Sequence, residues 1–329
     1  MSATTLANGT PDDALFRRTP VPAGLDVIDV HLNALGSGIE PAPGFYAAET
    51  LAAMQADPGG TGDGADDDAP RFVGGIAAPP AGVELLHASM ALQDDLLGTP
   101  GWQCWLRLDD EGGQRPPSGP LAQAALRLGA DGLLSRVSRR GGTGTGTGAG
   151  AGTGTGAVAA AIDADPELLA RFAGVKLMPQ HSGLPGRTTL AHLARHGTPV
   201  LVHAGIQCPV SWLERHLLPH LSGPVVLAHL GSWPCSADDL HRAVELASRD
   251  ARVHLETSGA NIGNFLRHAV DRVPERILFG SNRPMCAPRV QFAHVAASVA
   301  DDATLAAIAH GNAARLFGIS VDDAREPCR

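Results

Sequence analysis

The sequence predicts an α/β fold, a closed (β/α)8 barrel of the TIM type, because about eight apolar strand-like runs alternate with amphipathic stretches. Runs rich in Val, Ile and Leu that end at polar residues are typical of parallel strands with helices outside the sheet. A chain of 329 residues is long enough for one such barrel. The predicted strands cover residues 25–31, 71–77, 102–108, 174–178, 199–203, 225–229, 252–257 and 276–281.

Helical patterns separate the later predicted strands. Amphipathic stretches lie at 211–221, 237–250 and 264–273, and a further helical pattern at 301–318 ends at Gly318, a residue suited to a helix C-cap. A doubly wound open sheet is the competing architecture. It is disfavoured because no glycine-rich phosphate-binding turn follows the first predicted strand.

We expect one barrel domain at residues 25–318, preceded by a loose leader at 1–24 and followed by a tail at 319–329. Residues 139–157 are a low-complexity Gly/Thr/Ala stretch without apolar periodicity, which predicts a flexible insertion on the barrel rim. The insertion is interpreted either as a neutral expansion or as a lid over the site. Residues 56–70 are rich in Gly and Asp and predict a surface loop.

The composition is that of a globular protein. Hydrophobic residues make up 44% of the chain and charged residues 18%. The formal net charge is −9 without a basic cluster, so we expect neither a nucleic-acid partner nor an anionic membrane partner. No apolar run has the length of a membrane helix or a signal peptide, and the five cysteines show no CxxC spacing. We therefore expect a cytoplasmic protein with reduced thiols rather than a disulfide framework.

Polar residues at the ends of the predicted strands are the candidate site, because chemistry in a (β/α)8 barrel takes place at the carboxyl ends of the strands. Residues two apart on a strand point the same way, so His31 and Asn33 can face one cavity. A single His at a strand end is more often structural, whereas His at three strand ends indicates a site. The candidates are His31, Asn33, Lys176, His203, His229, Glu256, Asn282 and Arg283.

Lys176 is the only lysine of the chain. A lysine that points into a barrel cavity is costly unless it is paired. We interpret Lys176 as a residue that binds a substrate carboxylate or acts as an acid, with a structural role as the alternative. Glu256 and Arg283 are candidates for substrate binding, or for an ion pair with each other across neighbouring strand ends.

Two residues that follow predicted strands are weaker candidates for substrate binding. His181 comes just after the fourth predicted strand and could reach the site. Trp233 follows His229 in the stretch HLGSWP. It is predicted either to form the floor of a ring-binding pocket or to pack in the core or at the rim.

The ordered motifs IDVHLN, PVLVHAG, VVLAHLG, VHLETSG, RILFGSNRP and GNAARLFG resemble the amidohydrolase-related family of the amidohydrolase superfamily. The resemblance runs from about residue 25 to 318 and is weak over 45–70 and 110–160. It implies the distorted barrel of metal-dependent hydrolases. In that barrel an opening H-x-H motif, a His of the fifth strand and an Asp of the eighth bind a divalent metal. The sixth-strand His of the family acts as an acid or base or orients the substrate.

Mapped onto this chain, the resemblance makes His31 and His203 metal ligands and His229 the sixth-strand His, a third ligand if zinc is bound. Two positions depart from the family pattern, because Asn33 replaces the second His and Asn282 replaces the Asp. An amide oxygen is a poor zinc ligand beside imidazole, and an amide cannot accept a proton from metal-bound water. We therefore expect weak or absent zinc, and its restoration would require both Asn33→His and Asn282→Asp.

The resemblance also places Lys176 where some members carry a carboxylated lysine between two metals, but the second-metal ligands are absent from the sequence. We expect an enzyme that acts at a carbonyl or carboxyl carbon of a small organic substrate. Hydrolysis is the default, and metal-independent decarboxylation or cyclisation in a biosynthetic pathway is the alternative. In either case the catalytic residues would be His229 as proton shuttle, Lys176 as holder of negative charge, and Asn282, which with Asn33 would hydrogen-bond the substrate. The hypothesis from a different class is a catalytically inactive ligand-binding barrel, and homo-oligomerisation stays open.

Overall fold

The structure is a computed structural model. It describes residues 21–37, 39, 49–57, 69–79, 85–108, 114–116, 160–162, 164–165 and 167–324. The low-complexity insertion predicted at 139–157 lies outside the described residues, as do residues 1–20 of the predicted leader.

Eight parallel strands form the barrel, which confirms the predicted fold class, and each overlaps one of the predicted runs. A ninth strand, β2 (Glu49–Thr50), pairs in parallel with the end of the first. The sheet order is β2-β1-β3-β4-β5-β6-β7-β8-β9. The barrel strands are β1 (Asp26–Leu35), β3 (Arg71–Ala78), β4 (Trp102–Leu108), β5 (Gly174–Leu177), β6 (Val200–Val202), β7 (Val225–Leu227), β8 (Val253–Glu256) and β9 (Ile277–Leu278).

Backbone hydrogen bonds between β1 and the segment after β9 nearly close the barrel. Val30 N donates to Phe279 O at 3.0 Å, and Asn282 N donates to His31 O at 2.7 Å. Asn33 N continues the ladder by donating to Arg283 O at 2.8 Å. This closure brings the first and last strand ends of the sequence side by side, so the opening motif lies next to Asn282.

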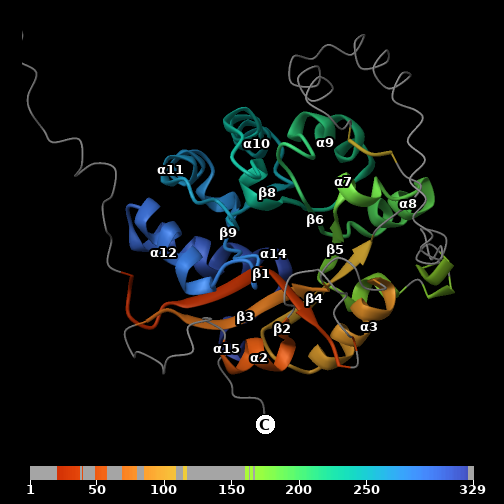
Figure 1. The fold of residues 1–329 in the computed structure, drawn as a ribbon, viewed down its shortest axis with the longest axis horizontal. Helices are drawn as coiled ribbons and strands as arrows, with labels where there is room; N and C mark the ends of the chain where they lie inside the picture. The colour runs from red at the N-terminus through yellow and green to blue at the C-terminus, as the bar shows by residue number, and fades with distance from the viewer. Residues whose placement is uncertain are drawn as a thin grey trace, which may run out of the picture.

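Helices surround the strands, as Figure 1 shows for α8 to α12. The longer ones are α3 (Leu85–Leu96), α8 (Arg187–His196), α9 (Val210–His216), α10 (Ala237–Arg249), α11 (Gly263–Arg272) and α12 (Pro288–Ser298). The shorter ones are α2 (Leu51–Ala56), α7 (Pro179–Ser182), α13 (Asp302–Ala306), α14 (Asn312–Phe317) and α15 (Val321–Ala324). None of the helices in the described part of the chain is long and apolar enough to cross a bilayer.

The C-terminal helix differs from its sequence prediction in one respect. The helix predicted at 301–318 is divided by a π-helical segment at Ala307–Gly311, so α13 and α14 are separate elements. Gly318 ends α14 with φ 67°, the left-handed conformation of a C-cap glycine. In the described part of the predicted tail, Ile319 is buried and α15 forms a short helix.

Two apolar clusters hold the barrel together. One lies between the strands and the surrounding helices and includes Val27 and Leu255. The other fills the barrel interior and includes Ile28, Trp105 and Leu201. Apolar side chains therefore fill the part of the barrel interior away from the carboxyl ends of the strands. Polar side chains occupy the carboxyl ends.

Candidate active site

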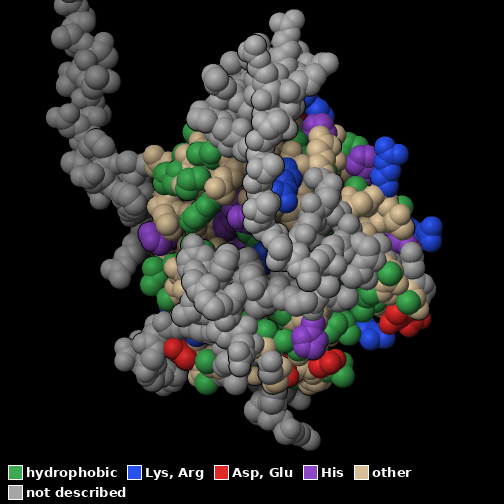
Figure 2. Space-filling model, turned by 45° about the vertical axis from the view of Figure 1, so that its right-hand side comes forward, with side chains coloured by type: hydrophobic (Ala, Val, Ile, Leu, Met, Phe, Trp, Pro, Cys, Tyr) green, Lys and Arg blue, Asp and Glu red, His purple; other side chains and the backbone are tan. Residues whose placement is uncertain are grey.

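A cavity of about 350 Å³ lies at the carboxyl ends of the strands. Recessed histidine and basic side chains are visible near the middle of the face in Figure 2. The cavity gathers the strand-end residues His31, Asn33, Lys176, His203, His229 and Asn282, together with His181 and Trp233. It is also lined by Arg107, Met178, Gln180, Leu201, Gln207, Ala228, Pro284 and Met285.

The opening motif reaches the cavity because β1 is irregular. The pairing of β1 with β3 shifts register between residues 29 and 32. Ile28 and Val30 pack in the barrel interior. The inward-facing positions change from even to odd residue numbers within the shifted segment, so that His31 and Asn33 line the cavity. An irregularity of this kind re-aims the side chains that follow it, and such features occur next to active sites.

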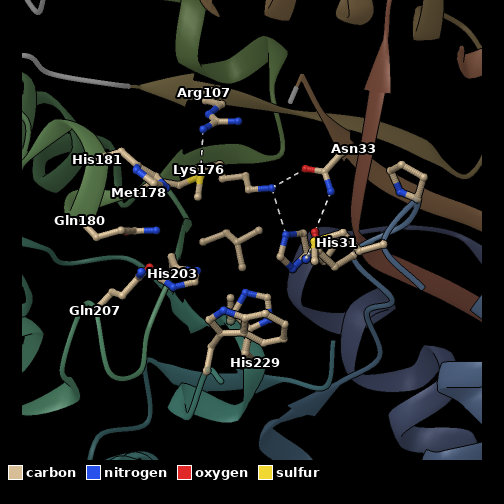
Figure 3. Close-up of a pocket in the computed structure, with 16 residues that line it drawn as sticks. His31, Asn33, Arg107, Lys176, Met178, Gln180, His181, His203, Gln207 and His229 are labelled. Carbon is tan, nitrogen blue, oxygen red and sulfur yellow. Dashed lines mark hydrogen bonds between the residues drawn. The ribbon is translucent and has the colours of Figure 1, made fainter. Parts of the chain in front are cut away.

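Lys176 lies at the centre of a hydrogen-bonded chain (Figure 3). Its Nζ is 2.9 Å from His31 Nε2 and 2.8 Å from Asn33 Oδ1. Asn33 Nδ2 in turn donates to Asn282 Oδ1 at 2.7 Å. The other ring nitrogen of His31, Nδ1, is 2.9 Å from Glu256 Oε2. The chain fits a neutral His31 that donates from Nδ1 to Glu256 and accepts at Nε2 from the Lys176 ammonium.

Glu256 is the buried negative charge at the end of the hydrogen-bonded chain that contains Lys176 and His31. Its side chain lies against Gly280, where an added Cβ would meet Glu256 Oε1 at 2.1 Å. Ser258 Oγ donates to Glu256 Oε2 at 2.8 Å. Burial raises the pKa of Glu256, and the neighbouring His229 and the hydrogen bonds from Ser258 oppose that rise.

The ring of His229 is hydrogen-bonded to the same serine, Ser258. Its Nδ1 is 2.8 Å from Ser258 Oγ and 3.0 Å from Ser258 O. Because Ser258 Oγ donates to Glu256, it accepts from His229 Nδ1–H, and Nε2 of His229 remains available as a proton acceptor. The backbone of His229 has φ 61° and that of Asn282 has φ 58°. Left-handed conformations at non-glycine residues are strained and cluster at functional sites.

Three histidines of the site, His31, His203 and His229, have lowered pKa values. Burial is the largest cause that lowers the pKa of His31, and the positive charges of Lys176 and Arg107 lower it further. The pKa of His203 is also lowered well below its usual value by burial and by the neighbouring His229. Burial lowers the pKa of His229 to about 4, although Glu256 acts in the opposite direction.

These pKa shifts predict that the protein loses stability as the pH falls from about 6.5 toward 4. In that range the unfolded chain binds a proton at His229 that the folded chain does not, so the free energy of unfolding falls with decreasing pH. We expect His229→Gln to reduce this fall by up to about 3 kcal/mol, since one pKa unit corresponds to roughly 1.4 kcal/mol. Urea unfolding at pH 4.5 and 7.0 measures the difference. His220→Gln, which removes an exposed histidine outside the cavity, is the control, and an equal fall in wild type and His229→Gln would contradict the prediction.

Two positions for a metal ion can be compared. His31, His229 and Glu256 are the one group in the described part of the chain that could hold a metal ion, with ligand atoms within 4.8 Å of one another. The position between His31 and Asn33, which the resemblance implies, does not fit a divalent cation. The Lys176 amino group already lies within 2.9 Å of both side chains. His203 is not part of the group.

Glu256 and Arg283 differ from their sequence predictions, because neither is among the described residues that line the cavity and the two do not pair with each other. Glu256 is fully buried and bonds to His31, while Arg283 Nη1 donates to Asp57 O at 2.5 Å. The ring centroid of His203 lies 5.0 Å from that of His229, and its buried Nε2 has no hydrogen-bond partner among the described residues. The role of His203 as a ligand stays a prediction.

Arg107, Ser258 and Gln180 were not predicted from the sequence. Arg107 is buried on β4, where Nη1 donates to Pro79 O at 3.0 Å and Nη2 contacts Met178 Sδ at 2.8 Å. Its signal was a charged residue inside the apolar run WQCWLRL. Ser258 follows Glu256 by two residues at a strand end, so the strand-end rule could have found it.

Comparisons with known proteins identify the family and the fold of the chain. The sequence profile of a family described as Amidohydrolase matches residues 138–319. A solved apo structure from Agrobacterium tumefaciens has a TM-score of 0.54 at 14% identity, covering 92% of this chain and 98% of that one. An amidohydrolase 2 from Bifidobacterium longum subsp. infantis has a TM-score of 0.49 at 16% identity, covering 90% of this chain and 100% of that one. For a 2,6-dihydroxybenzoate decarboxylase from Rhizobium the TM-score is 0.48 at 14% identity, with 90% and 99% covered. No curated protein matches the chain significantly.

Proposed function

The chain belongs to the amidohydrolase family, and from this premise we propose that it is an enzyme acting at the carbonyl or carboxyl carbon of a small organic anion. The observation that carries the proposal is the Lys176 amino group in the cavity wall, 2.9 Å from His31 Nε2 and 2.8 Å from Asn33 Oδ1. A fixed positive charge thus lies where the family pattern would place a metal ion. A second buried cation, Arg107, lines the same cavity.

Lys176 would stabilise negative charge that develops on the substrate oxygen. Donors held in place before the reaction, in a site that excludes water, stabilise such charge by about 10²–10³-fold in rate. His31 and Asn33 fix the position of the amino group, and Glu256 balances its charge through His31. The chain of hydrogen bonds therefore orients Lys176 toward the reacting oxygen without a bound metal.

His229 would move the proton in a hydrolytic reaction. Its Nε2 takes a proton from water as the water oxygen bonds to the carbonyl carbon, and the carbonyl oxygen becomes negative beside Lys176. When the bond to the leaving group breaks, His229 returns the proton to that group. Burial lowers the pKa of His229 to about 4, which leaves the imidazole neutral but weakens it as a base. The charge of Glu256 acts in the opposite direction and would stabilise the imidazolium that forms when His229 takes the proton.

Decarboxylation is the second candidate. It is favoured by the absence of Asp and Glu from the described residues that line the cavity, where the family pattern has an aspartate at the position of Asn282. In this reaction the bond between carbon and carboxylate breaks, and carbon dioxide leaves. The carbon then takes a proton from the Lys176 ammonium, which regains it from water.

The test uses the fact that Lys176 is the only lysine of the chain. Protein labelled with 15N-lysine carries one side-chain signal, which we expect to shift when an anionic substrate binds. A panel of small anionic esters, lactones, amides and carboxylic acids is assayed for turnover by mass spectrometry. Lys176→Met is expected to lower kcat/KM about 10²–10³-fold.

Arg171→Met is the matched control, since it removes a cation whose side chain is 53% exposed and outside the cavity. Full turnover in Lys176→Met would contradict the proposed role of Lys176. A shift of the lysine signal without turnover of any panel member would instead favour a ligand-binding barrel without catalysis.

A further inference from the structure

Three buried polar atoms on one wall of the cavity have no hydrogen-bond partner among the described residues. They are Nε2 and Oε1 of Gln180 and Nε2 of His203. Both residues line the cavity, and Figure 3 shows them on the side opposite Asn33. More than 90% of buried polar groups in proteins have a partner, and a buried group without one costs about 1–3 kcal/mol. Such atoms at a cavity wall indicate groups that a ligand satisfies.

The chemistry of this wall differs from that of the Lys176 wall. A Gln side chain offers both an acceptor and a donor, and a neutral imidazole offers one or the other. Gln180 is an uncharged side chain whose two polar atoms are both unpartnered among the described residues, whereas Lys176 presents an ammonium group to the cavity. A substrate group that both donates and accepts hydrogen bonds would satisfy the Gln180 amide at both atoms.

We propose that Gln180 and His203 form a neutral subsite that binds a substrate group with both a donor and an acceptor, namely a hydroxyl or a primary carboxamide. The substrate would then be a small organic anion whose reacting carbon lies at Lys176 and whose neutral polar group contacts Gln180. The position of the anion rests on the proposed function. The neutral subsite rests on the unpartnered atoms.

The remaining lining of the cavity limits the carbon skeleton of the substrate that joins the anionic group to the neutral polar group. Leu201, Met178 and Trp233 contribute apolar surface to its lining, and its volume is about 350 Å³. That volume is near the lower end for ligand pockets, and apolar walls favour a compact ring or branched chain. A rigid ring would hold the anionic group and the neutral group at opposite ends of the molecule.

Binding of matched ring monoanions tests the subsite without a known substrate. The probes are the 3- and 4-substituted benzoates that carry hydroxyl, carbamoyl or methyl, and calorimetry gives each Kd. We expect wild type to prefer the hydroxyl or carbamoyl probe over its methyl counterpart by about tenfold or more at one position, because a site built to hydrogen-bond rejects an analogue that cannot. Gln180→Leu and His203→Phe should reduce that preference to within about twofold while the methyl probe still binds.

Gln93→Leu is the matched control, because Gln93 Oε1 is also buried without a partner but lies outside the cavity. It should keep the wild-type preference. If Gln180→Leu does not fold, Gln180→Met replaces it. Equal binding of all probes to wild type, or a preference that survives both substitutions, would overturn the subsite. If Lys176→Met binds every anion as tightly as wild type, the proposed function fails, while a preference lost in Gln180→Leu still supports the subsite.

Discussion

Replacing His229 with Gln is expected to lower kcat by about 10²–10⁴-fold, the loss typical of a missing general acid or base. His31 and His203 are less suited to proton transfer than His229. His31 uses both ring nitrogens, one toward Lys176 and one toward Glu256. His203 Nε2 is buried, and no described residue forms a hydrogen bond with it. His229 lines the cavity, and Ser258 fixes its Nδ1, so its Nε2 is left to exchange a proton.

A Gln at position 229 can still donate to Ser258, so the expected loss concerns turnover rather than folding near neutral pH. Single-turnover kinetics on a panel substrate separates the chemical step from binding. Imidazole added to His229→Ala should restore part of the rate, which a purely structural role would not explain. His254→Gln should keep the wild-type rate, because His254 Nδ1 bonds to Arg252 O away from the cavity. A wild-type kcat in His229→Gln would contradict the assignment of His229 as the group that transfers the proton.

The barrel itself could be predicted because parallel strands buried on both faces give continuous apolar runs. The closing strand shows the limit of that signal. Residues 276–281 were predicted as one strand, yet β9 ends at Leu278, because the following residues turn to carry Asn282 into the cavity. Helix α12 was not predicted, since PRVQFAHVAAS has apolar residues on every side and no amphipathic period. The π-helical break between α13 and α14 has no sequence signal.

Individual residues of the site could be predicted from the sequence, but the contacts between them could not. The strand-end rule found His31, Asn33 and Lys176, because the chain direction of parallel strands fixes which end carries chemistry. Their partners depend on barrel closure. Glu256 is 225 positions from His31, and no local pattern indicates that the two meet. Gln180 lies in the short helix α7, where only the folded cavity distinguishes it from a surface residue.

Lys176 also changes what is needed to build a metal site in this barrel. Sequence comparison suggests that Asn33→His with Asn282→Asp would restore the family ligands. In the structure, however, the Lys176 amino group lies 2.9 Å from His31 Nε2, so a metal on that nitrogen would sit beside a positive charge. Two unit charges 4 Å apart repel by about 4 kcal/mol at an effective dielectric constant of 20, and a divalent ion doubles the repulsion. The doubled energy, about 8 kcal/mol, corresponds to a loss of about 10⁶-fold in metal affinity.

We therefore expect zinc to bind tightly only when Asn33→His, Asn282→Asp and Lys176→Ala are combined. Asn282→Asp alone should fail, because Asn33 bridges position 282 to Lys176, and a new carboxylate there would pair with the lysine rather than bind zinc. Metal content after dialysis against a chelator, and zinc titration by calorimetry, compare wild type, the two-residue variant and the three-residue variant. Lys176→Ala alone is the control, since it opens the space without supplying ligands. Stoichiometric zinc in the dialysed wild type, or equal affinity in the two- and three-residue variants, would show that Lys176 does not exclude the metal.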